Sequence, residues 1–241
     1  MRLKSQKNLL LACAAVTGIV LGAGPAFAET TQLQYQVHHS KYGNIGTYTN
    51  VVDTEGPNTT VTTKLNVKVS FLGISAYHQT ADRVEKWKGD HLQYLHANTT
   101  TNGKPVEVDG VAKGDHFEVT APDGTKEAPA NVRVANPWSP KLMDGDKIIT
   151  ADDGTVSNIQ ISPAQDSMVE VAGMQVPAKE YDIDLASLNE KYHVWFDNTG
   201  TAVKFDKTDK DGTVTFTLAS KTSSAPQVAS NTAVGAPQGT P

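Results

Sequence analysis

The sequence predicts an all-β fold of antiparallel strands. Apolar and polar side chains alternate along several short segments, as they do where one face of a strand is buried and the other is wet. Asp-Gly and Asn-Gly pairs recur between these segments, and such pairs tolerate the positive φ of tight hairpin turns. No long helical stripe competes with these strands. Spaced strands with such turns are typical of a meander, a sandwich or a barrel.

The clearest strand runs from Thr60 to Phe71, where six apolar or β-branched residues share one parity. The segment from Thr80 to Lys88 is ambiguous, because its alternation is weak. Shorter alternating segments are centred on Tyr35 and Val37, Phe117 and Val119, Ile159 and Ile161, Tyr181 to Leu185, Tyr192 to Phe196, and Val214 to Leu218.

Six dipeptides are the predicted turns. They are Asp109-Gly110, Asp123-Gly124, Asp144-Gly145, Asp153-Gly154, Asp211-Gly212 and Asn102-Gly103.

Residues 1–28 have the pattern of a signal peptide. Three basic residues precede an apolar run from Leu9 to Leu21, and Ala26-Phe27-Ala28 offers small residues at the cleavage site. The apolar run is shorter than the ~20 residues of a membrane span, so we expect no stable span after signal removal. A retained anchor and lipidation at Cys13 are the alternatives. We therefore expect a periplasmic or secreted protein.

The remainder divides into a single antiparallel β domain, 29–220, and a tail, 221–241. The tail is rich in Ser, Thr, Ala and Pro with one charge, and we expect it to be disordered. The chain without residues 1–28 carries 18 basic and 26 acidic residues, a net charge of −8. An acidic domain attracts neither nucleic acid nor an anionic membrane surface through its field. It also contains no cysteine once Cys13 is removed.

Several motifs occur in a familiar order. Gly43-Asn44-Ile45-Gly46 follows the first strand, Phe71-Leu72-Gly73-Ile74 ends the long strand, and Asn136-Pro137-Trp138 lies in mid-chain. Trp195-Phe196-Asp197 comes before Asp211-Gly212. The sequence resembles the exported bacterial family called domain of unknown function 6134 over most of Tyr35 to Leu218. It departs from the family at Phe196, where a tyrosine is expected, and in the acidic strand around Asp182.

The resemblance implies no activity. A fainter likeness to unknown-function family 3108 implies, by analogy with lipoprotein carriers, a curved sheet or incomplete barrel of about ten or more strands. Fold alone does not settle function.

The sequence predicts no catalytic residue, no metal site and no cofactor. His38-His39 and His91 with His96 point to opposite faces of regular strands, so neither pair chelates one ion. Asp206, Asp209 and Asp211 do not fit a calcium loop, because Lys207 and Leu218 would fall at its first and last ligand positions.

The aromatic side chains suggest a binding function. We predict that Trp87, Trp138, Trp195 and Tyr77 form the apolar walls of a ligand site; a packed core is the alternative. The strand at 192–196 has apolar residues on both faces, so one face must be covered by another segment or line a pocket. The Asn136–Pro140 loop is a candidate cover.

The first hypothesis is therefore an exported protein that holds an apolar small molecule or lipid non-covalently. A structural or interaction protein of the cell envelope, whose protein partner is unknown, is the second hypothesis. A hydrolase is the third.

Overall fold

The structure is a computed structural model that describes residues 28–71, 74–185 and 190–224. These residues form a large sheet of 14 strands and a small sheet of three. The predicted signal peptide up to residue 27, and residues 225–241 of the predicted tail, lie outside the described residues. No helix in the described ranges is long and apolar enough to cross a membrane.

The large sheet contains β1 (Ala28–His39), β2 (Gly43–Glu55), β3 (Asn58–Phe71), β4 (Ile74–Lys88), β5 (His91–Thr101), β6 (Lys104–Lys113), β7 (His116–Ala121), β8 (Gly124–Pro129), β12 (Gln160–Ile161), β13 (Gln165–Val171), β14 (Met174–Leu185), β15 (Glu190–Phe196), β16 (Ala202–Asp209) and β17 (Gly212–Ser224). The small sheet contains β9 (Arg133–Val134), β10 (Lys147–Ile149) and β11 (Val156–Asn158), and a short 3-10 helix, η1, spans Pro140–Asp144.

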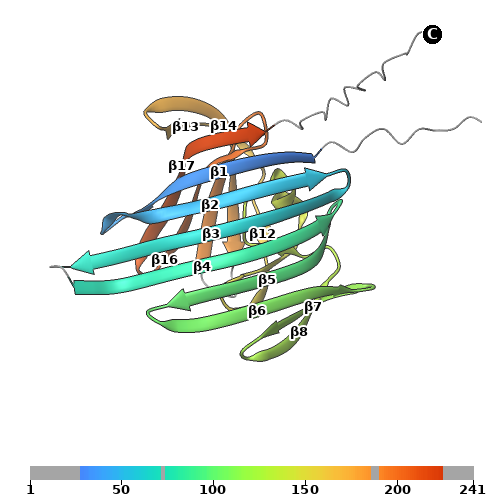
Figure 1. Cartoon of the computed structure of the whole chain (residues 1–241). Coiled ribbons are helices and arrows are strands. Elements are labelled where there is room, and N and C mark those ends of the chain that lie inside the picture. Colours follow the sequence, from blue (N-terminus) through green and yellow to red (C-terminus); the bar gives the residue numbers. More distant parts are fainter. Residues whose placement is uncertain (1–27, 72–73, 186–189, 225–241) are drawn as a thin grey trace, which may run out of the picture.

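The large sheet is an antiparallel meander whose first and last strands meet in its middle. Strands β1 to β8 follow one another side by side (Figure 1). Strands β14 to β17 form a second run, and β17 joins it to the first by pairing with β1. The predicted all-β, antiparallel fold is confirmed.

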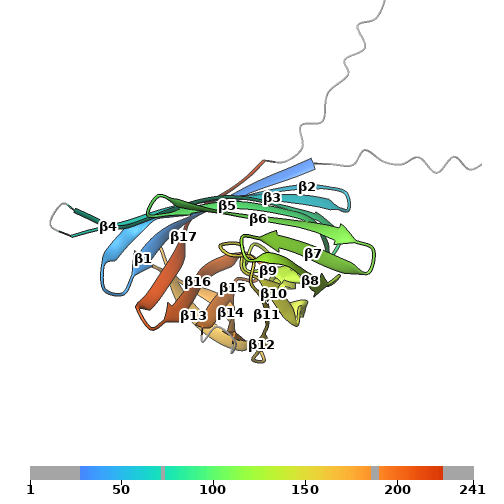
Figure 2. The ribbon, with the colours of Figure 1, turned by 90° about the horizontal axis from the view of Figure 1, so that it is seen from below.

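The sheet curves but does not close, because β8 and the β12–β13 edge do not pair with each other. Residues 130–159, which we call the crossing segment, connect these two edges and carry β9 to β11. Figure 2 shows the small sheet lying on the concave side, between β7–β8 and β12–β16. The incomplete barrel expected from the sequence is therefore present, with its interior partly filled by its own chain.

The crossing segment completes two hydrophobic cores. Ile148 packs into a core with side chains from β1–β3 and β14–β16, whereas Ile149 packs into a core with β3–β8. Neighbouring residues of a strand point to opposite sides, so a short strand such as β10 can serve both cores. This packing fixes the crossing segment against the sheet.

The ambiguous segment from Thr80 to Lys88 is part of β4. Its inward positions include two charged residues, Arg83 and Glu85, beside Ala81 and Trp87. The apolar alternation that identifies a strand is therefore absent, although the period of two is preserved.

Two of the predicted hairpin turns are wrong. Asp144-Gly145 ends the 3-10 helix η1, and Gly145 is extended with a φ of −95°. Asp109-Gly110 lies inside β6, and Gly110 pairs with Val119 of β7. A Cβ at Gly110 would lie 2.4 Å from Cε1 of Phe117, so this glycine makes room for the aromatic ring. By contrast, Asn102 and Gly103 have φ of 50° and 80° and make the predicted turn.

We expect Gly110→Ala to lower the free energy of unfolding by about 2 kcal/mol, because overpacking a core usually costs ~1–3 kcal/mol. Urea denaturation measures this loss. In a Phe117→Leu background the same substitution should cost much less, since the ring it would meet is gone. An equal loss in both backgrounds would contradict this steric explanation.

The last strand of the sheet extends beyond residue 220. Strand β17 runs to Ser224, and its last residues pair with Thr30 to Gln32 of β1. These exposed polar residues show no alternation, but the backbone hydrogen bonds of a strand do not require it. Residues 221–224 of the predicted tail are therefore part of the sheet.

Candidate ligand-binding site

A cavity of about 380 Å³ lies between the concave face of the sheet and the crossing segment. Its walls are mainly apolar side chains from the first core. They include Leu65, Ala135, Leu142, Ile148, Val194, Phe205 and Phe216. Phe205 and Phe216 stack with ring centroids 4.4 Å apart. The volume falls within the ~300–1,000 Å³ of typical ligand pockets.

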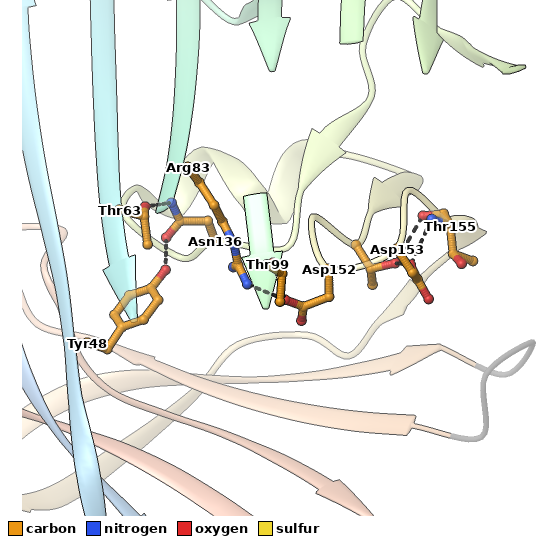
Figure 3. Close-up of polar contacts among 9 residues, drawn as sticks. Tyr48, Thr63, Arg83, Thr99, Asn136, Asp152, Asp153 and Thr155 are labelled. Carbon is orange, nitrogen blue, oxygen red and sulfur yellow. Dashed lines mark hydrogen bonds and ion pairs between the residues drawn. The ribbon is translucent and has the colours of Figure 1, made fainter. Parts of the chain in front are cut away.

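A buried arginine lies at one polar side of this cavity. Arg83 of β4 is 8% exposed, and its Nη2 lies 2.5 Å from Oδ1 of Asp152 in the crossing segment. The same carboxylate oxygen accepts a hydrogen bond of 3.2 Å from Thr99 of β5 (Figure 3). Burial lowers the pKa of Arg83, but nearby acidic groups, Asp152 first among them, raise it by more. The net pKa is therefore raised, and the guanidinium stays charged. Its Nε has no partner among the described residues.

A second polar group comes from β15 and β16. The Tyr192 hydroxyl donates a hydrogen bond of 3.1 Å to Glu190, and Lys207 lies 2.6 Å from the other oxygen of this carboxylate. Burial, followed by the charge of Glu190, raises the pKa of Tyr192, and Asp152 adds to this effect. The Tyr192 hydroxyl is therefore neutral and available only for hydrogen bonding.

A buried polar network joins the sheet to the crossing segment beside the cavity. Asn136 accepts hydrogen bonds from the Tyr48 hydroxyl (2.8 Å) and from Asn50 (2.9 Å). Its amide donates to Thr63 (3.1 Å) and to Glu85 (2.7 Å). Figure 3 shows Asn136 between Tyr48 and Thr63. Four strand residues thus hold one residue of the crossing segment.

Glu85 is the carboxylic acid of this network. It is 1% exposed, and one oxygen accepts hydrogen bonds from the indoles of Trp87 (3.0 Å) and Trp138 (3.3 Å). Burial raises the pKa of Glu85 to about 7, although the donors Asn136, Trp87 and Trp138 lower it.

The predicted wall residues fall in three places. Tyr77 lines the cavity. Trp87 and Trp138 lie together, with ring centroids 6.0 Å apart, and contact a hollow of only about 20 Å³. Tyr77 and Trp87 share one face of β4 but are ten residues apart, roughly 33 Å along a strand at ~3.3 Å per residue. One small ligand cannot contact both.

Trp195 lies on the opposite face of the sheet. It packs with Val169, Val171, Ala178 and Val203, while Val194 and Phe196 face the concave side. Strand 192–196 does have two apolar faces, as predicted. The cover over Trp195 is the β13–β14 hairpin, whereas the Asn136–Pro140 loop lies against Trp87.

The sequence analysis missed Arg83, Glu85 and Asn136. A signal for the first two was present, because they share the parity of Ala81 and Trp87 on β4. Asn136 carried no such signal, since its partners are 51 to 88 residues away in the chain.

Three possible metal ligands also meet on the convex face. His96 of β5 lies 2.8 Å from Asp109 of β6, and Glu107 is close to both. The side chains are at least partly exposed, and the contact of His96 with Asp109 is that of a surface pair. This arrangement assigns no metal.

Both basic groups that line the cavity are paired with acidic ones. Arg83 pairs with Asp152 and Lys207 pairs with Glu190. An apolar wall with a few polar groups at one side suits an amphipathic molecule.

These features define an incomplete β-barrel with a cavity between the curved sheet and a crossing segment. The chain belongs to the family described as domain of unknown function (DUF6134), whose family model matches residues 35–219. Comparison with the curated proteins finds no match.

One solved structure supports the fold. A β-barrel-like protein of domain of unknown function DUF1849 from Brucella abortus superposes with a TM-score of 0.58 at 9% identity, covering 80% of this chain and 96% of that chain. A DUF1089 family protein from Pseudomonas aeruginosa has a TM-score of 0.27 at 10% identity, covering 86% of this chain and 95% of that chain. The first likeness concerns the fold alone, and the second supports no argument.

Proposed function

We propose that this protein binds an apolar or amphipathic small molecule non-covalently in the cavity of its curved sheet. The observation that carries the proposal is a cavity of about 380 Å³ that combines an apolar wall with polar groups on one side. The wall includes Tyr77 but not the three tryptophans, so the cavity is lined mainly by aliphatic residues and phenylalanines.

Packing around the cavity supports this proposal. The Asn136 network and Ile148 and Ile149 hold the crossing segment in place, so the cavity is largely formed before a ligand enters. A preformed site reduces the ordering cost of binding.

A space-filling variant tests the proposal. Leu65 lines the cavity and is only partly buried. We expect Leu65→Trp to occupy part of the cavity and to weaken binding of N-phenyl-1-naphthylamine, a fluorescent apolar probe, at least ~10-fold, equivalent to ~1.4 kcal/mol. Fluorescence titration of residues 29–241 measures the affinity.

Val111→Trp is the matched control, because Val111 is 41% exposed and lies on the face of β6 opposite the core residue Val108. This variant should bind the probe as the unsubstituted chain does. Equal affinities of all three proteins, or no binding by the unsubstituted protein, would rule out the cavity as the site. If the probe binds in the cavity, native mass spectrometry of protein purified from its source cells would identify the natural ligand through its added mass.

We further propose that the protein acts outside the cytoplasm after removal of residues 1–28, as a periplasmic or secreted protein. Support comes from the basic, apolar and small-residue zones of this segment. N-terminal sequencing of the protein from the extracytoplasmic fraction should begin at Glu29; an intact Met1 in the cytoplasmic fraction would refute export.

A further inference from the structure

Arg83 is a buried charged group with more hydrogen-bond donors than partners. It lines the cavity and is 8% exposed. A guanidinium carries five N–H donors, yet among the described residues the Arg83 side chain donates a single hydrogen bond, from Nη2 to Asp152. Its Nε is buried and has no partner there. Buried polar groups are nearly always hydrogen-bonded in folded proteins, so an unmatched donor at a cavity indicates that another molecule supplies the acceptor.

The carboxylates on the polar side of the cavity already accept hydrogen bonds from the protein. One oxygen of Asp152 accepts from Thr99 as well as from the guanidinium (Figure 3). The two oxygens of Glu190 are contacted by the Tyr192 hydroxyl and by Lys207. The unmatched group on this side is therefore a donor. A ligand would complete it with an acceptor oxygen, which a protonated amine does not have.

The charges on this side of the cavity are balanced in pairs. Arg83 lies against Asp152, and Lys207 lies against Glu190. Both cations of the described lining are thus already paired, so a ligand carboxylate would lose its water without gaining a free cation. A neutral carbonyl oxygen accepts the same hydrogen bond and brings no net charge. The arrangement therefore favours a neutral acceptor over an anionic one.

A second buried arginine shows why the size of the cavity matters. Arg133 is 6% exposed, and its Nε also lacks a partner among the described residues. It borders the hollow beside Trp87, which has a volume of only about 20 Å³. A space of this size has room for about one water molecule. Arg83 borders a cavity of about 380 Å³, so the acceptor for its donor can belong to a ligand.

We propose that the cavity selects apolar molecules with a neutral carbonyl group, such as a ketone, an ester or an amide, whose oxygen accepts a hydrogen bond from Nε of Arg83. This inference rests on the binding function proposed above. The apolar part of the ligand would lie against Leu65, Phe205 and Phe216. A ligand that displaces water from a buried donor must replace its hydrogen bond, because an unmatched donor weakens binding.

Three naphthalenes of nearly equal shape test this selectivity. 2-Acetylnaphthalene carries a carbonyl group where 2-ethylnaphthalene carries a methylene group, and 2-naphthoate carries a carboxylate. Each would be titrated at pH 7.5 into residues 29–241 loaded with N-phenyl-1-naphthylamine. Hydrogen bonds to charged groups are stronger than neutral ones. We therefore expect the ketone to displace the probe at ~5-fold lower concentration than the more apolar 2-ethylnaphthalene, equivalent to ~1 kcal/mol, and at lower concentration than 2-naphthoate.

The variant Arg83→Lys removes the unmatched donor and keeps a positive charge beside Asp152. Lysine carries its three donors on one terminal nitrogen and has no counterpart of Nε. We expect the preference for the ketone over 2-ethylnaphthalene to fall ~5-fold, so that the two ligands bind equally. The ratio of the two affinities is the readout, because both ligands meet the same apolar walls and a general change in the cavity affects them alike.

Arg133→Lys is the matched control. The change in the side chain is the same, and Nε of Arg133 is also unmatched, but Arg133 does not line the cavity. Its guanidinium carbon lies 5.8 Å from the ring centroid of Trp87 instead. This variant should keep the preference for the ketone.

The outcomes separate the two proposals. If the probe binds but 2-ethylnaphthalene or 2-naphthoate displaces it at as low a concentration as the ketone does, the carbonyl inference is wrong and the binding function stands. The same conclusion follows if Arg83→Lys keeps the preference, or if Arg133→Lys loses it as well. If Arg83→Lys does not fold, the comparison of the three ligands on the unsubstituted protein decides the inference.

Absence of probe binding would remove the binding function, and the inference with it. A preference for the ketone that is lost only in Arg83→Lys supports both.

Discussion

Replacing Asn136 by alanine is expected to lower the free energy of unfolding by about 4 kcal/mol. The substitution removes four buried hydrogen bonds and leaves Tyr48, Asn50 and Glu85 without one of their partners. An orphaned buried polar group costs ~1–3 kcal/mol, and here several are orphaned together. Losses above ~4 kcal/mol are rare for single substitutions, so this value is close to the upper range.

Urea denaturation with an unchanged m-value would measure the loss. Asn98→Ala is the control, because Asn98 is an exposed residue of β5, and surface substitutions usually stay within ~0.5 kcal/mol. A loss for Asn136→Ala as small as that of the control would show that the network does not hold the crossing segment.

The strands could be predicted because their apolar pattern is local. In β3, Val61, Val67 and Val69 are buried, while Lys64 and Lys68 between them are exposed, as the sequence indicates. Trp195 illustrates the limit of this reasoning. Its parity showed that β15 has a second apolar face, but the β13–β14 hairpin that covers this face is adjacent only in three dimensions.

The buried polar residues beside the cavity could be predicted only in part, because they contradict the rule that inward positions are apolar. Arg83 and Glu85 occupy inward positions of β4, and the weak alternation there reflects a functional or structural demand. Such conflicts between local pattern and burial are themselves a signal. Arg83 contacts Asp152 and Glu85 contacts Asn136. Both partners lie on the crossing segment, and no local pattern indicates that these residues meet.

A buried polar network of this kind specifies position more than it adds stability. Hydrophobic contacts of Ile148 and Ile149 tolerate small shifts along the sheet, whereas the hydrogen bonds of Asn136 are satisfied in one arrangement. We infer that the network sets the register of the crossing segment, and so the dimensions of the cavity beside it.

Stability is expected to fall as the pH rises from 5 to 8, and Glu85 is expected to cause most of this fall. Burial, opposed by hydrogen bonds and by Arg83, raises the pKa of Glu85 from 4.5 to about 7 in the folded chain. The folded state therefore binds the proton more tightly than the unfolded state between these two values, and stability decreases with rising pH in this window. Below 4.5 both states are protonated, and above about 7 both are ionised, so the contribution is constant outside it.

The size of the effect follows from the difference between the two pKa values. Each unit corresponds to ~1.36 kcal/mol, so the full change is about 3 kcal/mol, most of it between pH 5 and pH 8. Carboxyls with lowered pKa values, such as Asp153, act mainly at lower pH and in the opposite direction. His116, whose pKa is raised by its hydrogen bond to Asp115, acts in the same direction as Glu85.

The variant Glu85→Gln separates these contributions, because only the wild-type chain can ionise at position 85. The difference in unfolding free energy between the two proteins, measured in urea at pH 5 and pH 8, should change by about 2–3 kcal/mol in favour of the variant at the higher pH. His116→Gln serves as the comparison and should shift the pH dependence far less, since His116 is at the surface. If the difference between wild type and Glu85→Gln is the same at both pH values, the carboxyl of Glu85 does not titrate in this window, and this explanation of the pH dependence is wrong.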